Sequence, residues 1–281
     1  FSKNVVDNFT QMYAQGLTPN PCVECNRSVK FDHFITQAKK LNCDKVATGH
    51  YAKIIKKNNE FELHKADYLD KDQSYVLHML KSSDLENISF PLGEISKPEV
   101  RQIAARIGLK TAFKKDSQDI CFVGKKDYRS FVEKRIDLTS PGEIFDIEGN
   151  KVGDHNGIHE FTVGQRKGLP GGYGTPRYVT KINVQNKNVT IGEKKDLLVS
   201  SFIVEELSCV NDLEYKNLTI QTRYNSEDLP CEIKKLSDTK VIVQLKEPAF
   251  GVAPGQFGVI YNGTKVVCGG RISPKVLENI G

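Results

Sequence analysis

Residues 18–31 read T-P-N-P-C-V-E-C-N-R-S-V-K-F, and they determine how the first part of the chain is built. The two prolines of T-P-N-P forbid a helix and favour an extended turn. An amphipathic helix is expected directly after the turn, with an apolar face formed by Phe31, Phe34, Ile35 and Ala38. We therefore expect Cys25 at the mouth of this helix, where backbone N–H groups stabilise a thiolate and depress its pKa.

Helix and strand signals on both sides of this turn indicate an α/β unit. Val5, Phe9 and Met12 fall at helical spacing, and Gly16 follows as the end of that helix. Residues 45–48, K-V-A-T, predict a short buried strand that runs into G-H-Y. A strand that follows a helix and breaks off at glycine suggests a ligand site at its carboxyl end.

A further helix begins at Ser96, which forms a capping box with Glu99 and has a proline in its first turn. Its apolar face consists of Val100, Ile103, Ala104 and Ile107. Gly108 ends it. The sequence therefore predicts another amphipathic helix in this part of the chain.

After about residue 127 the pattern changes from helices to strands. One helix is expected around residues 128–135, and strand signals follow at 142–147, 177–183 and 188–192. From about residue 201 apolar and polar side chains alternate in the segments 218–224, 230–236, 240–245, 256–261 and 265–270. The pair Asn262-Gly263 is a two-residue hairpin turn. Short strands at even spacing predict a small closed β-barrel.

Length and composition set the class of protein. A chain of 281 residues suggests two or three domains, which we place at 1–126, 127–200 and 201–281. Apolar residues make up 38% and charged residues 27%, and the mean hydropathy is −0.42, as in soluble globular proteins. There is no apolar run of membrane-helix length and no apolar core of a signal peptide. Collagen, coiled coil, disorder and membrane spans are excluded.

The net charge of +5 is unevenly distributed along the chain. Residues 1–126 carry +5, residues 127–200 carry +1 and residues 201–281 carry −1. A mild basic bias is compatible with a polyanionic partner. An ordinary solvated surface is the simpler explanation for a bias of this size.

Seven cysteines without a secretory signal indicate a reducing compartment and no disulfide framework. Cys22 and Cys25 form a C-x-x-C pair, for which three interpretations stay open. A structural zinc site needs two further ligands, and the other cysteines are isolated in the sequence. A thioredoxin-type redox pair normally follows a strand, which is missing here. The third interpretation uses Cys25 alone as a reactive thiolate, against the common case of an inert buried thiol.

Three other segments are ambiguous when each is taken alone. Residues 115–122, K-D-S-Q-D-I-C-F, place Cys121 at the end of a strand or the edge of a loop. Residues 71–75, K-D-Q-S-Y, resemble the polar start of a helix. Residues 164–169, G-Q-R-K-G-L, form a basic loop bracketed by glycines, which could hold a phosphate on its backbone amides.

Taken together, these segments closely resemble the bacterial and organellar tRNA-specific 2-thiouridylase family. The shared motifs are, in chain order, the T-P-N-P-C-V-E-C-N-R-S-V-K-F stretch, A-T-G-H-Y, K-D-Q-S-Y, K-D-S-Q-D-I-C-F, G-Q-R-K-G-L, T-R-Y and P-G-Q. The resemblance runs from Phe1 to about residue 275. It implies a multidomain α/β plus β fold: part of an adenine-nucleotide alpha hydrolase-like (PP-loop) α/β domain, a small α+β central tRNA-binding domain and a C-terminal β-barrel.

The resemblance also implies a catalytic site. Cys25 corresponds to the catalytic thiol of the family, and Cys121 corresponds to the cysteine that carries the persulfide sulfur. Asn20, Pro21 and Cys22 correspond to the residues that line the target base, where some members have aspartate in place of Cys22. No residue is assigned to a metal.

Further positions match contacts with ATP and tRNA. Gly49 corresponds to an ATP contact. The implied tRNA contacts are His50, Lys71, Asp72, Gln73, Arg223, Tyr224 and Gln256. From the residue types we add Arg166 and Lys167, because the glycines that flank them let the backbone approach a phosphate.

The implied reaction replaces the C2 oxygen of the wobble uridine by sulfur. A uracil carbonyl is a poor electrophile, and adenylation by ATP with Mg²⁺ turns its oxygen into a leaving group, releasing pyrophosphate and then AMP. A low-pKa sulfur nucleophile then attacks C2, and Cys25 and Cys121 are left as a disulfide that must be reduced. The implied partners are the tRNA anticodon stem-loop, whose base must leave its stack, and a persulfide donor such as a cysteine desulfurase or relay protein. Such a tRNA-uridine 2-sulfurtransferase is cytoplasmic or organellar and is not bound to a membrane.

One departure concerns the ATP site. The family has an S-G-G-x-D-S phosphate loop after its first strand, and the only Gly-Gly pairs here are Gly171-Gly172 and Gly269-Gly270. We expect that the chain lacks an N-terminal portion of the enzyme and does not adenylate tRNA unaided.

Three competing interpretations follow from the same residues. The first is a tRNA-binding relative without catalysis, and the second is a zinc or redox protein built on the C-x-x-C pair. The third, a methyltransferase, lacks a glycine-rich adenosylmethionine loop after an opening strand.

Overall fold

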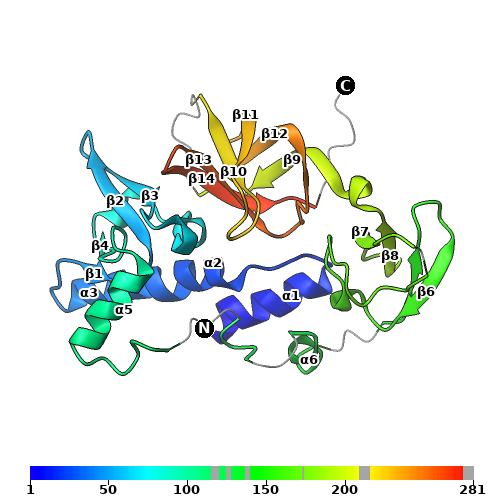
Figure 1. The fold of residues 1–281 in the computed structure, drawn as a ribbon, viewed down its shortest axis with the longest axis horizontal. Coiled ribbons are helices and arrows are strands. Elements are labelled where there is room, and N and C mark those ends of the chain that lie inside the picture. Colours follow the sequence, from blue (N-terminus) through cyan, green and yellow to red (C-terminus); the bar gives the residue numbers. More distant parts are fainter. Residues whose placement is uncertain (115–119, 125–127, 137–139, 173, 209–215, 275–281) are drawn as a thin grey trace.

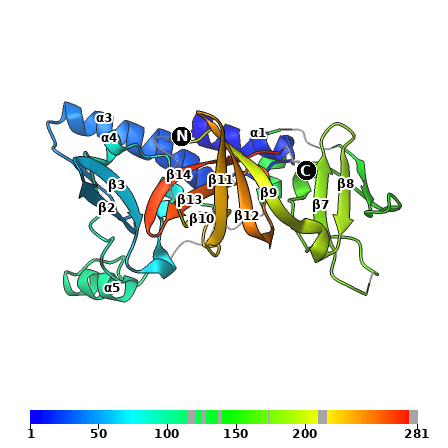
Figure 2. The ribbon, with the colours of Figure 1, turned by 90° about the horizontal axis from the view of Figure 1, so that it is seen from above.

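The computed structural model describes residues 1–114, 120–124, 128–136, 140–172, 174–208 and 216–274. The chain forms a helical part with a short parallel sheet, a small four-stranded sheet and a β-barrel (Figure 1). Seen from above, the barrel lies between the hairpin of β2 (Ala52–Lys57) and β3 (Glu60–Lys65) and the strands β7 (Tyr178–Asn183) and β8 (Asn188–Gly192) (Figure 2). The predicted multidomain α/β plus β architecture is confirmed.

The first helix follows the predicted pattern. Residues Ser2–Asp7 wind as a π-helix and continue into α1 (Asn8–Ala14). The buried side chains of this helix are Val5, Val6, Phe9, Thr10, Met12 and Tyr13. Gly16 follows with a φ of 65°, the left-handed conformation in which glycine ends a helix at little cost.

The second helix begins earlier than predicted. It consists of α2 (Pro21–Cys25), a π-helical stretch (Asn26–Phe31) and α3 (Asp32–Lys40). The side chain of Asn20 caps α2 by accepting a hydrogen bond from the Val23 N–H at 3.4 Å, and Pro21 occupies the first turn, where a missing N–H costs nothing. Cys25 is therefore the last residue of α2, and the prediction that it lies at a helix N-terminus is wrong.

The α/β part contains a short parallel sheet. Strand β1 (Val46–Ala47) pairs with β4 (Ile88–Ser89), so the strand predicted at 45–48 is present but covers two residues. It is not the buried strand that was predicted, since Ala47 is exposed and Val46 is half-buried. Along the chain, the β2–β3 hairpin and α4 (Ser82–Leu85) come between these two strands.

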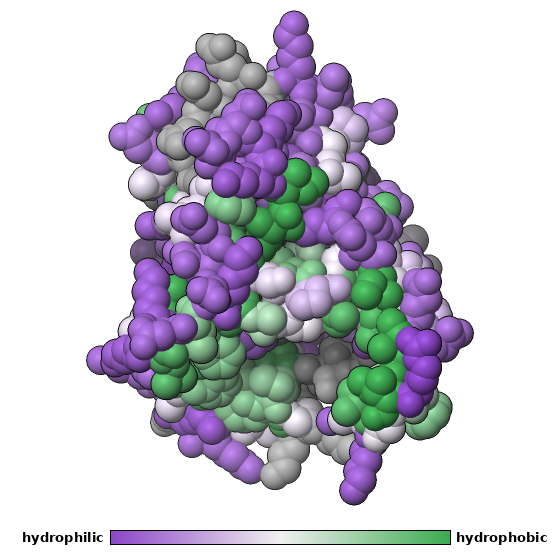
Figure 3. All heavy atoms as spheres, turned by 90° about the vertical axis from the view of Figure 1, so that its left-hand side faces the viewer, coloured by the Kyte–Doolittle hydropathy of each residue, from purple (hydrophilic) through white to green (hydrophobic). Residues whose placement is uncertain are grey.

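Helix α5 (Lys97–Arg106) starts with the predicted capping box, in which the Ser96 hydroxyl and the Glu99 carboxylate each bond the other's backbone N–H. Its predicted apolar face is left largely uncovered, because the helix buries no residue and Ile107 is 63% exposed. Apolar side chains border a hollow on this end of the molecule (Figure 3). Phe34 on α3 and Phe113 beyond α5 are exposed apolar side chains of the first part of the chain, at 46% and 85%.

The middle of the chain forms a small α+β unit. Helix α6 (Tyr128–Glu133) packs through Val132 against Phe9 and Tyr13 of α1. The sheet has the order β6-β5-β8-β7, with β5 (Gly142–Phe145) parallel to β8 and β6 (Lys151–His155) antiparallel to β5. Its core consists of Ile144, Ile158, Phe161, Val179, Val189 and Ile191.

The last part is a closed barrel, as predicted. Its strands are β9 (Leu198–Glu205), β10 (Leu218–Gln221), β11 (Leu229–Ser237), β12 (Lys240–Phe250), β13 (Phe257–Asn262) and β14 (Lys265–Ile272). The ring runs β13-β10-β11-β12-β9-β14 and closes through β13–β14 pairing. Asn262-Gly263 makes the predicted hairpin turn. Strand β10 stops at Gln221, so Arg223 and Tyr224 lie in a turn.

The β2–β3 hairpin, which the sequence did not reveal, extends this barrel sheet. His64 of β3 is paired with Lys265 of β14, and the Lys65 N–H donates to the carbonyl oxygen of Thr264 at 2.8 Å. Two segments some 200 positions apart in the chain therefore form one continuous sheet.

In the part of the chain that the structure describes, no helix has the length and apolarity that a membrane span requires.

A buried ion pair joins the second helix to the barrel. Glu24 accepts a hydrogen bond from Arg271 of β14 at 2.9 Å and another from Arg27 at 2.6 Å. The Glu24 and Arg271 side chains are only 5% and 12% exposed. Their mutual attraction is thus weakly screened by water.

Replacing Arg271 by Met should lower the free energy of unfolding by about 3 kcal/mol, because it leaves the buried Glu24 carboxylate short of a partner. Urea titration followed by circular dichroism measures the change. The control, Lys235→Met, removes one member of an exposed pair with Asp238 and should leave the midpoint where it is. Equal midpoints for Arg271→Met and the unaltered chain would contradict this account.

Candidate functional site

Three free thiols gather where α2 meets the segment 120–124. Cys22 and Cys25 are one helical turn apart on α2, so they share a face. Cys121 lies close enough for the charge of its thiolate to raise the pKa of both. The structure thus brings together the cysteines that the sequence singled out.

Aromatic packing holds Cys121 in place. The ring of its neighbour Phe122 lies 5.3 Å from Phe9 and 5.7 Å from Phe1, in edge-to-face contacts that stabilise aromatic pairs. Ile120 and Val123 pack on the same cluster. Residues 115–119, the first part of the K-D-S-Q-D-I-C-F motif, lie outside the described residues.

The thiols of α2 are harder to ionise than predicted. Burial raises the pKa of Cys25 above its ordinary value of 9.0, while the nearby ammonium of Lys30 acts in the opposite direction. Burial also raises the pKa of Cys22: although Cys22 lies at the surface, neighbouring atoms still desolvate its thiol. The predicted pKa decrease fails because Cys25 sits at the end of α2 and the helix continues, so no unpaired N–H groups face its thiol.

Sequence reasoning missed Lys30. Its ammonium favours the thiolate forms of Cys22 and Cys25, and it lies 3.4 Å from Nε2 of His50. Lys30 belongs to the π-helical stretch, where hydrogen bonds run from residue i to i+5 and turn the side chains away from their α-helical directions. Its place beside the thiols therefore could not be found from α-helical spacing.

His50 is a buried, neutral imidazole. Burial and the charge of Lys30 lower its pKa to about 4. Nδ1 of His50 lies 2.8 Å from the hydroxyl of Thr48, and its ring packs near Phe31 and Phe90. The preceding residue, Gly49, is exposed just beyond β1, at the carboxyl end where a ligand site was predicted.

Two side chains of the K-D-Q motif, residues 71–73, make hydrogen bonds within the protein. Asp72 is buried and accepts hydrogen bonds from the Ala66 N–H at 2.8 Å and from the Ser74 hydroxyl at 2.6 Å. Gln73 accepts a bond from the Tyr51 N–H at 3.1 Å. Of this motif, Lys71 is half-buried and lies beside the exposed Asp70.

The P-G-Q motif also makes internal bonds. Gln256 donates to the carbonyl oxygens of Thr18 and Pro19 at 3.4 and 3.3 Å, so the barrel holds the T-P-N-P turn. Gly255 has a φ of 90°, and a Cβ there would lie 2.8 Å from the Thr18 nitrogen. Only glycine allows this close approach.

Arg223 is held by the backbone, with Nε and Nη2 donating to the carbonyl oxygen of Gly251 at 2.9 and 2.6 Å. A Cβ on Gly164 would lie 3.6 Å from its Nη2, so the basic glycine loop lies beside it. Within that loop Arg166 and Lys167 are exposed. Tyr224 exposes 39% of its surface.

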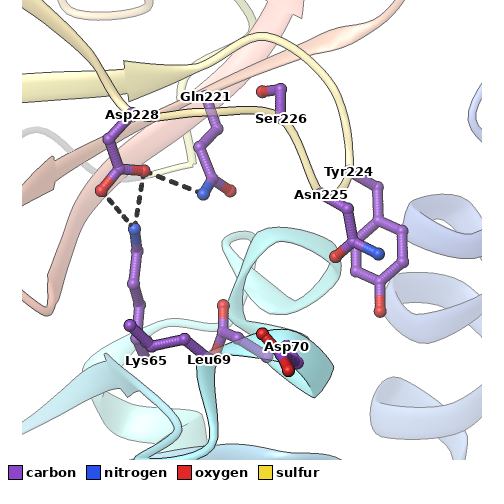
Figure 4. Close-up of a pocket in the computed structure, with 9 residues that line it drawn as sticks. Lys65, Leu69, Asp70, Gln221, Tyr224, Asn225, Ser226 and Asp228 are labelled. Carbon is purple, nitrogen blue, oxygen red and sulfur yellow. Dashed lines mark hydrogen bonds and ion pairs between the residues drawn. The ribbon is translucent and has the colours of Figure 1, made fainter.

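A cavity of about 490 Å³ separates the K-D-Q segment from the turn that carries Arg223 and Tyr224 (Figure 4). Its lining combines side chains from the hairpin end and the barrel: Lys65, Leu69, Asp70, Asp72, Gln221, Tyr224, Asn225, Ser226 and Asp228. The two segments expected to contact tRNA thus form opposite walls of one depression.

Neither a phosphate loop nor a cysteine metal site is found among the described residues. Gly49 offers an exposed backbone at the sheet edge, but no glycine-rich loop is present there to bind the phosphates of ATP. In the described ranges, the only three potential ligand groups that lie within 4.8 Å of one another belong to Glu133, His159 and Glu160. Cys22 and Cys25 therefore have no further ligand at metal distance there, which weighs against the zinc interpretation.

Three family models match in succession. Residues 1–125 match the tRNA methyl transferase HUP domain, residues 129–193 the tRNA methyl transferase PRC-barrel domain, and residues 199–272 the Aminomethyltransferase beta-barrel domain.

Curated relatives match nearly the whole chain. The tRNA-specific 2-thiouridylase MnmA of Chloroflexus aurantiacus is 42% identical over 278 residues, which cover 97% of this chain and 77% of the relative. The enzymes of the same name from Rickettsia prowazekii and Lachnoclostridium phytofermentans are each 41% identical, over 98% and 97% of this chain and 78% of their own length. The chain belongs to the tRNA-specific 2-thiouridylase family.

This membership confirms the resemblance drawn from the motifs. The 2-thiouridylase relatives are longer than this chain, which spans about three quarters of their length. The expectation that an N-terminal ATP-binding portion is missing stays a prediction, as do the domain boundaries at 126/127 and 200/201. The words "methyl transferase" occur in two family descriptions, whereas the relatives named above are 2-thiouridylases.

The raised pKa of Cys25 predicts slow alkylation near neutral pH. Labelling by iodoacetamide should reach the exposed Cys43 before Cys25, and the rate at Cys25 should keep rising beyond about pH 9. Peptide mass spectrometry after timed labelling measures both rates. Lys30→Met should slow Cys25 further, since it removes the charge that favours the thiolate, whereas Lys39→Met on the exposed side of α3 should not. Unchanged labelling in Lys30→Met would show that Lys30 does not act on the thiol.

Proposed function

We propose that this chain performs the sulfur-transfer part of tRNA 2-thiouridine synthesis at the wobble uridine, with Cys25 and Cys121 as its two working thiols. One observation carries the proposal: the free thiol of Cys121, from a distant part of the chain, lies close enough to raise the pKa of Cys25. Family membership supports the reaction class, because the relatives are 2-thiouridylases.

In the proposed mechanism Cys121 carries the persulfide. The Cys25 thiolate attacks Sγ of Cys121, the bond from that Sγ to the terminal sulfur breaks, and the terminal sulfur leaves as hydrosulfide with the electron pair. Hydrosulfide attacks C2 of the adenylated uridine, the bond from C2 to the adenylated oxygen breaks, and AMP and a proton leave, while Cys25 and Cys121 remain as a disulfide. In the alternative route the terminal sulfur of the Cys121 persulfide attacks C2 directly and AMP leaves with the former C2 oxygen. The Cys25 thiolate then attacks Sγ of Cys121, the bond from that Sγ to the transferred sulfur breaks, and the sulfur stays on C2 while Cys25 and Cys121 form a disulfide. Both routes need an external dithiol to restore the thiols.

The proposed base site is the turn at the start of α2. Asn20 caps α2, and Pro21 and Cys22 begin this short helix, of which Cys25 is the last residue, so a base extruded from the anticodon loop would meet the thiols there. The ammonium of Lys30 acts on the Cys25 thiol and lies 3.4 Å from Nε2 of the neutral His50. Activation of the C2 oxygen by ATP and Mg²⁺ belongs to the proposed whole reaction, and we assign no phosphate-binding residue in this chain.

The proposed tRNA surface combines the basic glycine loop with the walls of the cavity. Arg166 and Lys167 are exposed beside Arg223, where a phosphate backbone can reach them. Tyr224 offers an aromatic face on which an unstacked base can lie. Asp72, Gln73 and Gln256 are proposed to shape this surface through the internal bonds described above.

The second candidate is a tRNA-binding relative without catalysis. The exposed basic loop and Tyr224 fit it equally well, since both act on RNA binding alone. The two candidates differ in what they require of the thiols.

A persulfide assay separates these candidates without ATP. After exposure to inorganic polysulfide, the unaltered chain should release sulfide and form a Cys25–Cys121 disulfide, detected as a linked peptide. Cys25→Ser should keep the persulfide on Cys121 and release none, and Cys121→Ser should form no disulfide with Cys25. Cys43→Ser is the matched control, and tRNA affinity should be equal in all forms. Sulfide release that is the same in every variant would refute the assigned roles.

The basic loop gives a second test. Reversing both charges, Arg166→Glu with Lys167→Glu, should weaken tRNA binding at least about tenfold. It should also lower the slope of log affinity against log salt concentration by about two, which corresponds to two lost phosphate contacts. Filter binding at several salt concentrations measures both. The control pair, Lys234→Glu with Lys235→Glu, changes two exposed residues of β11 and alters the net charge equally. If the control weakens binding as much, the effect comes from net charge and not from the loop.

A further inference from the structure

A buried lysine forms one wall of the cavity beside the proposed tRNA surface (Figure 4). Lys65, at the end of β3, has a side chain that is only 8% exposed. Its ammonium donates to both carboxylate oxygens of Asp228 on the barrel, at 2.7 and 2.6 Å. It also lies 4.1 Å from the centre of the Tyr261 ring. A lysine held in this way is committed to the protein and is not offered to RNA.

The ion pair belongs to a ring of polar contacts. Gln221 donates to Asp228 at 2.9 Å, and its carbonyl oxygen lies 3.4 Å from the Tyr261 hydroxyl. That hydroxyl lies 3.2 Å from the Ser74 hydroxyl, which in turn donates to Asp72. Asp72 accepts from the N–H of Ala66, the residue after Lys65, and this bond closes the ring.

The ring connects the two segments that the proposed function assigns to tRNA. Asp72 lies between Lys71 and Gln73, and the turn 222–228 between Gln221 and Asp228 carries Arg223 and Tyr224. Two contacts of the ring, Lys65–Asp228 and Ser74–Tyr261, cross from the hairpin side to the barrel side. The other hydrogen bonds hold the residues at the ends of these two crossings. The separation of the two cavity walls is therefore set by these contacts, in which Lys65 and Asp72 are buried and the Asp228 side chain is 37% exposed.

We propose that Lys65 and Asp228 are positioning residues for RNA binding. They hold the segments 71–73 and 222–228 at the separation that lets both engage one RNA, and neither contacts the RNA. The inference rests on the proposed tRNA function. Its physical basis is that contacts made by two rigid walls add up only if the walls stay at a fixed spacing.

The sign of the effect separates positioning from simple electrostatics. If the pair acted on RNA only through charge, removing the negative Asp228 would strengthen binding and removing the positive Lys65 would weaken it. If the pair holds the walls together, either loss weakens binding. Asp228→Asn is thus the informative variant.

The experiment measures the affinity of a substrate tRNA transcript for the full chain by filter binding at several salt concentrations, with thermal unfolding in parallel. Lys65→Met, Asp228→Asn and the double variant should each weaken binding about tenfold without a change in the salt slope. The double variant matters because a single change leaves an unpaired buried charge that could unfold the chain. It removes both charges at once and so decides the question if the single variants do not fold.

Lys265→Met is the matched control. Lys265 pairs with Glu62 at 2.7 Å across the same hairpin–barrel junction, but it does not line the cavity. It should leave tRNA affinity within about twofold of the unaltered chain. If Lys265→Met weakens tRNA binding as much as the Lys65 and Asp228 variants do, the effect comes from the stability of the hairpin–barrel junction in general, and the proposal is overturned.

Three other outcomes also overturn the positioning role. Tighter binding by Asp228→Asn would show plain electrostatics, and a salt slope lowered by about one in Lys65→Met would show a direct phosphate contact. Unchanged affinity in the double variant would show that the pair does nothing for RNA. If the unaltered chain itself binds no tRNA, the proposed function fails first, and this result is distinct from the other three.

Discussion

The ion pair between Glu24 and Arg271 is the contact on which the arrangement of the site depends. Glu24 lies between Cys22 and Cys25 on α2, and Arg271 lies on β14 of the barrel. Because both side chains are almost fully buried, the pair fixes the orientation of α2 as well as its position. The carbonyl oxygens of the preceding turn are bound by Gln256 in the same way. The barrel therefore sets where the thiols point, although all of its residues are distant from them in the chain.

Local features of the fold could be predicted from the sequence, and features that depend on distant partners could not. The Ser96 capping box and the Asn262-Gly263 turn act within a few residues, so their patterns predict structure directly. The β2–β3 hairpin gains its place by pairing with β14, which no local pattern encodes. The exposed face of α5 shows the reverse case: its helical periodicity is real, but packing depends on what lies opposite.

The same distinction applies to the candidate site. The motifs placed Cys25 and Cys121 in one site, and the structure brings them together. They did not reveal Lys30, whose direction depends on π-helical winding, or the capture of Arg223 by the Gly251 carbonyl oxygen. The sequence also suggested a lowered pKa for Cys25, because the helix was expected to start at that residue. The Asn20 cap starts α2 earlier, at Pro21, and the pKa of Cys25 is raised. Electrostatic detail of this kind is set by tertiary structure.

The raised pKa of Cys25 gives the proposed sulfur transfer a direction. A thiolate with a higher pKa is a stronger nucleophile once formed and a poorer leaving group, so Cys25 is suited to attack Sγ of Cys121 and not to be displaced. Burial keeps Cys25 protonated for most of the time, and the ammonium of Lys30 lowers the cost of ionising it. A thiol that rests in the protonated form is also less exposed to oxidation than a standing thiolate. Burial thus keeps the standing amount of Cys25 thiolate low, and the nearby cation eases its formation for the proposed attack.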